Sequence, residues 1–318
     1  MPNRWRRRAT LPNAILAWAA LAGAALLAVG CTSSSAADQP GADGKIIAVG
    51  AENEYADVIA QVGGKYVQAS AIMSNPNTDP HTFEASASTG RLVNAARLVV
   101  QNGLGYDTFM DTIEKAVPDS GRRVIVVQKL LGLPDSTPNP HLWYDPATMP
   151  KVADAIAASL AAIQPSHAAY FKANAKTFAN SLAPWINAIG TFKQHYPGTP
   201  VATTEPVADY LLQALGADNK TPWAFQADVM NGTDPSAQDV AIERSLFTEH
   251  KVKAFVYNQQ VTDSLTESFI SLARANHIPV VGVYETMPEP GYHYQSWMLA
   301  EVRALQKAVT SGVSSEHL

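Results

Sequence analysis

The sequence predicts an α/β protein with two βα domains, each built on a parallel sheet, that are joined by one long rigid helix. Short β-branched and apolar runs alternate with amphipathic stretches over residues 45–164 and again over residues 197–318. This alternation is typical of parallel strands connected by helical crossovers. Between the two regions, residues 165–196 carry no strand signal, and their apolar residues recur at helical spacing.

The first region is expected to contain four strands and four helices. The strands are predicted at residues 45–51, 65–73, 97–103 and 122–128, and the helices at residues 53–64, 88–96, 106–117 and 145–163. At the start of the last of these helices, Asp145 is expected to be the N-cap and Pro146 the first helical residue, positions that both residue types favour.

The connecting segment is predicted to be one helix with a single apolar face. The residues of this face are Phe171, Ala175, Phe178, Leu182, Trp185, Ile189 and Phe192. Pro184 lies within the segment and should bend the helix or cost roughly 3 kcal/mol. At 1.5 Å per residue the helix would be about 45 Å long, more than a small domain needs. We therefore favour a helix that spans both domains over a core helix of one domain.

The second region resumes the alternation. Strands are predicted at residues 200–204, 252–258 and 278–284, and helices at residues 206–215, 235–250, 264–277 and 294–309.

The N-terminus has the features of an export signal. Four arginines within the first eight residues precede an uncharged apolar stretch that ends at Gly30. A membrane anchor helix is the alternative, but it needs about 20 apolar residues. Residues 1–30 are therefore predicted to be a lipoprotein signal peptide and residues 31–44 a flexible tether.

Cys31 is the only cysteine of the chain and directly follows the apolar stretch. This arrangement resembles a bacterial lipobox, although Ala28 stands where a leucine is usual. Lipidation of Cys31 is favoured over a free thiol. The formal net charge of −5 becomes more negative when the signal arginines are removed, which disfavours nucleic acid as a partner.

Four side chains of metal-ligand type follow predicted strands. His81 and His141 lie in proline-containing turns of the first region, while Glu205 and Glu285 directly follow strands of the second. Ligands of such sheets bind beyond the carboxyl ends of the strands. Two imidazoles and two carboxylates suit zinc, manganese or iron. The alternatives are a structural or surface role for each histidine and helix capping for each glutamate.

His293 is the main alternative to Glu285 as the fourth ligand. It lies eight residues after Glu285, beyond a proline-rich turn, at the predicted start of the final helix. Glu285 is preferred because the strand direction places its carboxylate near the cleft, whereas His293 can face solvent.

Five motifs together resemble a known family. They are "ENEYADVIAQVGG", "TDPHTFEAS", "NPHLWYDP", "TTEPVADYLLQALG" and "ETMPEPGYHYQSWM". In this order they are similar to the solute-binding lipoproteins of bacterial zinc, manganese or iron ABC importers, the cluster A-I family. The resemblance implies two pseudo-symmetric domains, a rigid linking helix and a metal ion in the cleft between them. It also implies ligands at His81, His141, Glu205 and Glu285, a monomer anchored by lipid outside the cytoplasm, and an ABC permease as partner.

The sequence departs from the family pattern at several points, and these differences do not decide which metal is bound. The segment before His141 contains no histidine-rich loop, which zinc-type members commonly have. Zinc-type members usually have histidine where this chain has Glu205, and many manganese-type members have aspartate where it has Glu285.

Three other functions compete with metal capture. A metal-dependent hydrolase needs an open coordination position and a nearby base, but four protein ligands would close the site, and the H-E-x-x-H motif is missing from the sequence. An adhesin would need an adhesive surface, of which the sequence gives no sign. A siderophore binder would hold its ligand with exposed arginines and aromatic residues. We therefore expect a binding protein and not an enzyme.

Overall fold

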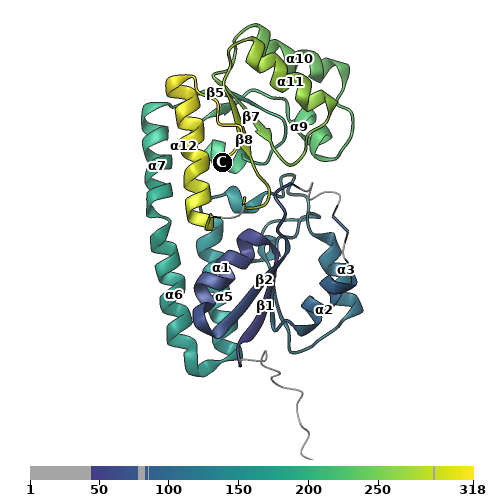
Figure 1. Cartoon of the computed structure of the whole chain (residues 1–318), viewed down its shortest axis with the longest axis vertical. Helices are drawn as coiled ribbons and strands as arrows, with labels where there is room; N and C mark the ends of the chain where they lie inside the picture. The colour runs from purple at the N-terminus through teal and green to yellow at the C-terminus, as the bar shows by residue number, and fades with distance from the viewer. Residues whose placement is uncertain (1–43, 78–82, 85, 289–290) are drawn as a thin grey trace, which may run out of the picture. The chain divides into compact units, whose positions relative to one another are not determined.

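Two parallel four-stranded sheets form the framework of the protein (Figure 1). The computed structural model describes residues 44–77, 83–84, 86–288 and 291–318, which belong to one compact unit. The first sheet has the order β2-β1-β3-β4 and the second the order β6-β5-β7-β8. The strands are β1 (Ile46–Glu52), β2 (Val67–Met73), β3 (Leu98–Gln101), β4 (Arg123–Val126), β5 (Pro200–Thr203), β6 (Asp218–Asn219), β7 (Ala254–Asn258) and β8 (Val280–Val283). The predicted fold class is confirmed.

Helices connect the strands of each sheet. In the first half they are α1 (Asn53–Gly63), α2 (Ala87–Ala95), α3 (Thr108–Ala116), α4 (Val127–Leu130) and α5 (Thr148–Ile163). In the second half they are α8 (Asp209–Leu215), α9 (Trp223–Met230), α10 (Ala237–Thr248), α11 (Ser264–Ala275) and α12 (Tyr294–Ser311). Among the described residues, we find no helix with the length and apolar character needed to span a membrane.

The sequence did not predict the short elements β6, α4 and α9. It also placed the start of α5 too early. Leu142–Tyr144 form a 3₁₀ turn, and α5 begins only at Thr148. The prediction that Asp145 is the N-cap is wrong, because its carboxylate accepts a hydrogen bond from the amide of Ala147, which precedes the helix (2.9 Å).

The predicted connecting helix consists of two consecutive helices, α6 (Ala168–Ser181) and α7 (Ala183–His195). They follow one another along one side of the protein (Figure 1). The helix is interrupted at Leu182, two residues before Pro184, the residue expected to bend it. Proline has no backbone N–H and cannot continue the helical hydrogen bonds. All seven residues of the predicted apolar face are buried.

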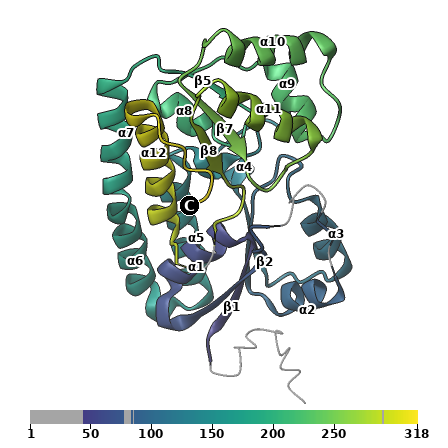
Figure 2. The same ribbon diagram turned by 45° about the horizontal axis from the view of Figure 1, so that its top comes forward.

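This apolar face belongs to a core that includes residues of both sheets. The cluster contains Val100 of β3 and Val201 of β5, together with Trp185 of α7 and Tyr294 of α12. The rings of Trp185 and Tyr294 meet edge to face at 5.8 Å. Figure 2 shows α12 beside α7 and next to the second sheet. Each large side chain buried here stabilises the fold by about 1.5–3 kcal/mol. Because residues of both sheets belong to this one cluster, the core links the two halves.

The C-terminal segment after α12 runs along the edge of the second sheet. The amide of Ser315 donates to the carbonyl of Val280, and the amide of Gly282 donates to the carbonyl of Ser315, both at 2.9 Å. A Cβ atom on Gly282 would lie 2.1 Å from the Glu316 carbonyl oxygen. Glycine at this position allows the tail to pair with β8 and cover an otherwise open edge.

Candidate metal site

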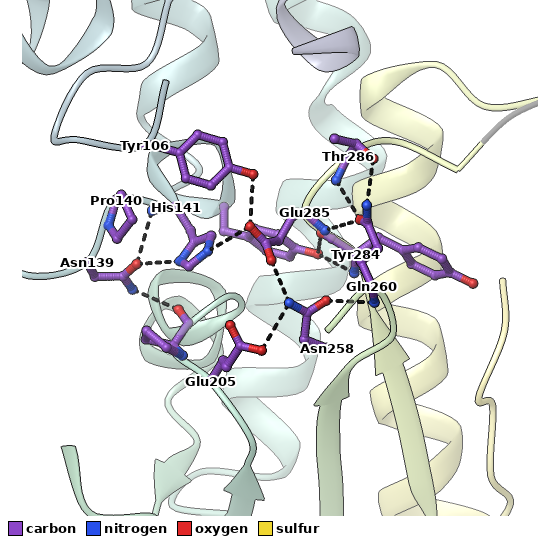
Figure 3. Close-up of polar contacts among 12 residues, drawn as sticks. Tyr106, Asn139, Pro140, His141, Glu205, Asn258, Gln260, Tyr284, Glu285 and Thr286 are labelled. Carbon is purple, nitrogen blue, oxygen red and sulfur yellow. Dashed lines mark hydrogen bonds and ion pairs between the residues drawn. The ribbon is translucent and has the colours of Figure 1, made fainter. Parts of the chain in front are cut away.

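Three of the four predicted ligands lie in the described part of the chain, and all three are buried. His141 follows α4 in the first half, Glu205 follows β5, and Glu285 follows β8. His81 and Cys31 lie outside the described residues. The structure brings the other three side chains to neighbouring positions beyond the carboxyl ends of the strands (Figure 3).

Hydrogen bonds fix the His141 ring in one orientation. The side-chain oxygen of Asn139 accepts from the His141 backbone amide at 3.0 Å and lies 2.8 Å from Nδ1 of the ring. The Asn139 side-chain nitrogen donates to the carbonyl of Pro206 at 2.8 Å, so its oxygen must be the atom that faces the ring. Nδ1 therefore carries a proton, so that in the neutral ring the lone pair is on Nε2. This is the tautomer that a metal ligand needs.

A second amide braces the turn that carries His141. Asn102 donates to the carbonyl of Pro140 at 2.8 Å, and its oxygen accepts from the Tyr55 hydroxyl at 2.6 Å. Proline at position 140 already restricts the backbone. The turn is therefore held from both sides, and the imidazole keeps a constant direction.

Glu285 is the centre of the described contacts. Its Oε2 atom lies 3.5 Å from Nε2 of His141 and accepts from the Tyr106 hydroxyl at 2.9 Å. Its Oε1 atom accepts from the side-chain amide of Asn258 at 2.5 Å. The same amide donates to Oε1 of Glu205 at 3.2 Å. The first half of the chain thus reaches Glu285 through His141 and Tyr106.

The backbone around Glu285 is held as firmly as its side chain. The side-chain oxygen of Gln260 accepts from the amides of Glu285 at 2.7 Å and Thr286 at 2.8 Å. The Tyr144 hydroxyl donates to the carbonyl of Tyr284 at 2.8 Å. These contacts prevent the segment after β8 from shifting, so the carboxylate has a defined position (Figure 3).

Two further buried carboxylates, which the sequence reasoning missed, lie where β1 passes into α1. Glu52 and Glu54 are fully buried, and none of their four side-chain oxygens has a hydrogen-bond partner among the residues that the structure describes. Burial raises the pKa of both groups well above the usual range, and the negative charge of Glu285 raises the pKa of Glu54 further. The signal was present in the sequence, since "ENE" follows a strand as directly as Glu205 and Glu285 do.

The described side chains do not make a complete metal site by themselves. Within the ranges that the structure describes, we find no group of three or more His, Cys, Asp or Glu residues that could hold a metal ion. The Asn258 amide lies between the two glutamates, and His81 is outside these ranges. His293 is exposed, and its Nδ1 lies 2.7 Å from the carboxylate of Asp57.

Glu301, whose Oε1 atom lies 3.4 Å from the Tyr144 hydroxyl, leads to a prediction about the dependence of stability on pH. This buried carboxylate accepts from the Trp297 indole at 2.8 Å, and burial raises its pKa to about 8. The folded protein therefore keeps a proton that the unfolded chain loses above about pH 4.5. Stability falls as pH rises between these values, by about 1.4 kcal/mol per pH unit for a single group.

We expect Glu301→Gln to remove this contribution, because an amide does not titrate. As the pH is raised from 5 to 9, the melting temperature of the variant should increase relative to that of the wild type. Calorimetry at a series of pH values measures this difference. Glu249→Gln, at an exposed position, is the matched control and should change nothing. Parallel pH profiles for wild type and Glu301→Gln would contradict the prediction.

The fold and the strand-end site define the class of two-lobed α/β binding proteins that hold a ligand beyond their strands. Residues 49–308 match the family described as zinc-uptake complex component A, periplasmic, and the chain belongs to this family. The manganese-binding lipoprotein MntA of Bacillus subtilis is 23% identical over 273 residues, which cover 83% of this chain and 87% of MntA. The zinc-binding protein TroA of Treponema pallidum is 22% identical over 263 residues, which cover 80% and 83% of the two chains.

Solved structures share the fold. The periplasmic zinc-binding protein TroA of Treponema pallidum superposes with a TM-score of 0.71 at 19% identity, covering 85% of this chain and all of that chain. A manganese-bound periplasmic metal-binding protein from Candidatus Liberibacter asiaticus gives a TM-score of 0.69 at 17% identity, with 83% of this chain and all of that chain covered.

Proposed function

We propose that the protein captures a divalent transition metal ion outside the cytoplasm and delivers it to a membrane ABC permease. The proposed ligands are His81, His141, Glu205 and Glu285, and the metal is the cargo. Family membership supports the transport role, and relatives named for zinc and manganese support the kind of cargo.

The observation that carries the proposal is the orientation of His141. Its ring is buried, its Nδ1 proton is bound to Asn139, and its Nε2 atom lies 3.5 Å from Glu285 Oε2. A lone pair on Nε2 and the Glu285 carboxylate would repel each other unless a cation lay between them, so this arrangement supports a metal-binding role. The exposure of His293 and its contact with Asp57 support Glu285 as the fourth ligand.

The ligands divide between two proposed domains, residues 45–164 and residues 197–318, with residues 165–196 as the link. We favour binding over catalysis, because four protein ligands leave no coordination position for a reactive water. The described contacts give no support to an adhesin, which would need an adhesive surface and not a buried site.

The test of this function is a titration of the metal-stripped protein with zinc and with manganese. We expect one ion to bind per chain, tightly enough to compete with a chromogenic chelator. Elemental analysis of protein purified from its own host, for zinc, manganese and iron, then identifies the physiological cargo. A wild-type protein that takes no metal from a weak chelator would exclude the proposal.

We also propose that Cys31 becomes the lipidated N-terminus after residues 1–30 are removed, with residues 31–44 as the tether. The place of the cysteine directly after a short apolar stretch supports this. Two or more acyl chains would anchor the protein stably. Mass spectrometry of protein from the membrane fraction should find a diacylated or triacylated Cys31, and an uncleaved or unmodified N-terminus would contradict the assignment.

A further inference from the structure

Asn53 connects the first half of the chain to the main chain just beyond Glu285. It is the first residue of α1, directly after β1, and its side chain is buried. Its amide nitrogen donates to the carbonyl of Met287 at 2.7 Å, and its amide oxygen accepts from the backbone N–H of Met287 at 2.8 Å. One side chain of the first half therefore binds both main-chain polar groups of a buried residue in the second half.

The orientation of the Asn53 amide is fixed by this pair of hydrogen bonds. Rotating the amide by 180° would place its NH₂ group against the N–H of Met287 and its oxygen against the Met287 carbonyl. An apolar side chain at position 53 would leave two buried main-chain groups without this partner. The chain could relieve that penalty only if the segment moved or water entered.

The helix that carries Asn53 is itself held against α12. One oxygen of Asp57 accepts from the backbone amide of Tyr294 at 2.9 Å, and the other lies 2.7 Å from Nδ1 of His293. One turn further along α1, the side-chain amides of Gln61 and Gln295 exchange two hydrogen bonds of 3.0 Å. These contacts keep α1 next to the beginning of α12 (Figure 2), so α1 gives Met287 a firm support.

The first half of the chain holds the main chain on both sides of Glu285. Before Glu285, the Tyr144 hydroxyl donates to the carbonyl of Tyr284 at 2.8 Å. After it, Asn53 binds Met287, which lies two residues further along the chain. Loss of the Asn53 contacts would leave the segment after Glu285 free to shift relative to the first half.

We propose that Asn53 is a positioning residue for the metal site, which holds the Glu285 carboxylate in place relative to His141. This inference rests on the proposed function. His141 belongs to the first half and Glu285 to the second, so an ion bound by both requires that the two halves keep their relative position. A looser Glu285 segment should therefore weaken metal binding, although Asn53 does not itself contact the ion.

The test compares Asn53→Ala with Gln61→Ala. Gln61 also lies on α1 and also binds the second half through an amide, but its partner Gln295 lies within α12, well beyond Glu285. It therefore controls for the loss of a contact between the halves. The measured quantity is the zinc Kd of the metal-stripped protein. We expect it to rise by about tenfold or more in Asn53→Ala, as for other residues that orient a ligand, and to stay unchanged in Gln61→Ala.

Two further readouts separate positioning from a general loss of stability. The visible absorption spectrum of the cobalt-loaded protein reports the geometry of the ligands, and it should change in Asn53→Ala but not in Gln61→Ala. In a double-mutant cycle, adding Asn53→Ala to Glu285→Gln should raise the zinc Kd by less than about twofold, because the residue through which Asn53 acts is already altered. Asn53→Ser carries the test if the alanine variant does not fold by circular dichroism.

Four outcomes would overturn the inference. A wild-type zinc Kd and cobalt spectrum in the position-53 variants would exclude Asn53 as a positioning residue and leave the proposed function intact. An equal loss of affinity in Gln61→Ala would attribute the effect to any contact between α1 and α12. An undiminished loss in the Glu285→Gln background would mean that Asn53 does not act through Glu285. A wild-type protein that binds no zinc would exclude the proposed function and this inference with it.

Discussion

His141→Ala is expected to reduce zinc affinity by more than 100-fold while the metal-free protein remains folded. Loss of a residue that only orients a metal ligand costs roughly 10–100-fold, and removal of a ligand should exceed this. The imidazole is buried, and its Nδ1 atom is held by Asn139, so its Nε2 atom has no other position to adopt. Calorimetric titration with zinc measures the loss.

The fold should survive because His141 lies in a turn outside the strands and helices. The turn keeps the Asn102 contact to Pro140 and the main-chain contact of position 141 to Asn139. The cavity left by the ring should cost a few kcal/mol at most, within the range for large-to-small core substitutions.

His293→Ala is the matched control, since it removes a histidine that is exposed and bound to Asp57. Zinc affinity should be unchanged in this variant. If His293→Ala lost the metal and His141→Ala kept it, the proposed ligand set would be wrong, and His293 would have to replace a member of it.

The fold could be predicted from the sequence because its strongest signals are periodic. The apolar face from Phe171 to Phe192 repeats at helical spacing over two full helices, and burial of all seven residues confirms it. The sequence did not predict that the helix is interrupted at Leu182. Pro184 indicates that the helix is distorted there, but it does not show whether the helix bends or ends. The two-residue strand β6 has too few residues to produce any pattern.

The proposed ligands could be selected from the sequence because Glu205 and Glu285 directly follow predicted strands, and because His81, His141 and Glu205 each lie beside a proline. The residues that orient them could not. Asn139, Asn258 and Gln260 act through amide hydrogen bonds between parts of the chain that only the fold brings together. Asparagine is also common in turns, where its side chain hydrogen-bonds to nearby backbone. The sequence alone cannot distinguish this local role from a contact to a distant ligand residue.

Metal binding is expected to raise the melting temperature of the wild-type protein by about 8–16 °C. A ligand at about 1,000 times its Kd stabilises the folded state by about 4 kcal/mol. Each kcal/mol corresponds to roughly 2–4 °C in proteins of about 150–250 residues. Calorimetry of the metal-stripped protein with and without zinc measures the shift, and excess chelator should reverse it.

The same experiment on Glu285→Gln separates metal binding from general stabilisation by ions. Glutamine has nearly the shape of glutamate and its oxygen can still accept from Asn258 or Tyr106, but it has no charge to offer a cation. Glu285 joins the two halves of the chain, because it follows β8 and contacts His141 and Tyr106 of the first half. An ion bound there links residues of both sheets, so binding and folding are coupled.

We therefore expect the zinc-induced shift to fall to less than half its wild-type value in Glu285→Gln. Glu249→Gln, at an exposed position of the same half, should keep the full shift. An undiminished shift in Glu285→Gln would mean that the stabilising ion binds elsewhere. If saturating zinc did not change the melting temperature of the wild-type protein, metal binding would not be coupled to folding. This result would contradict the proposed link between the two sheets.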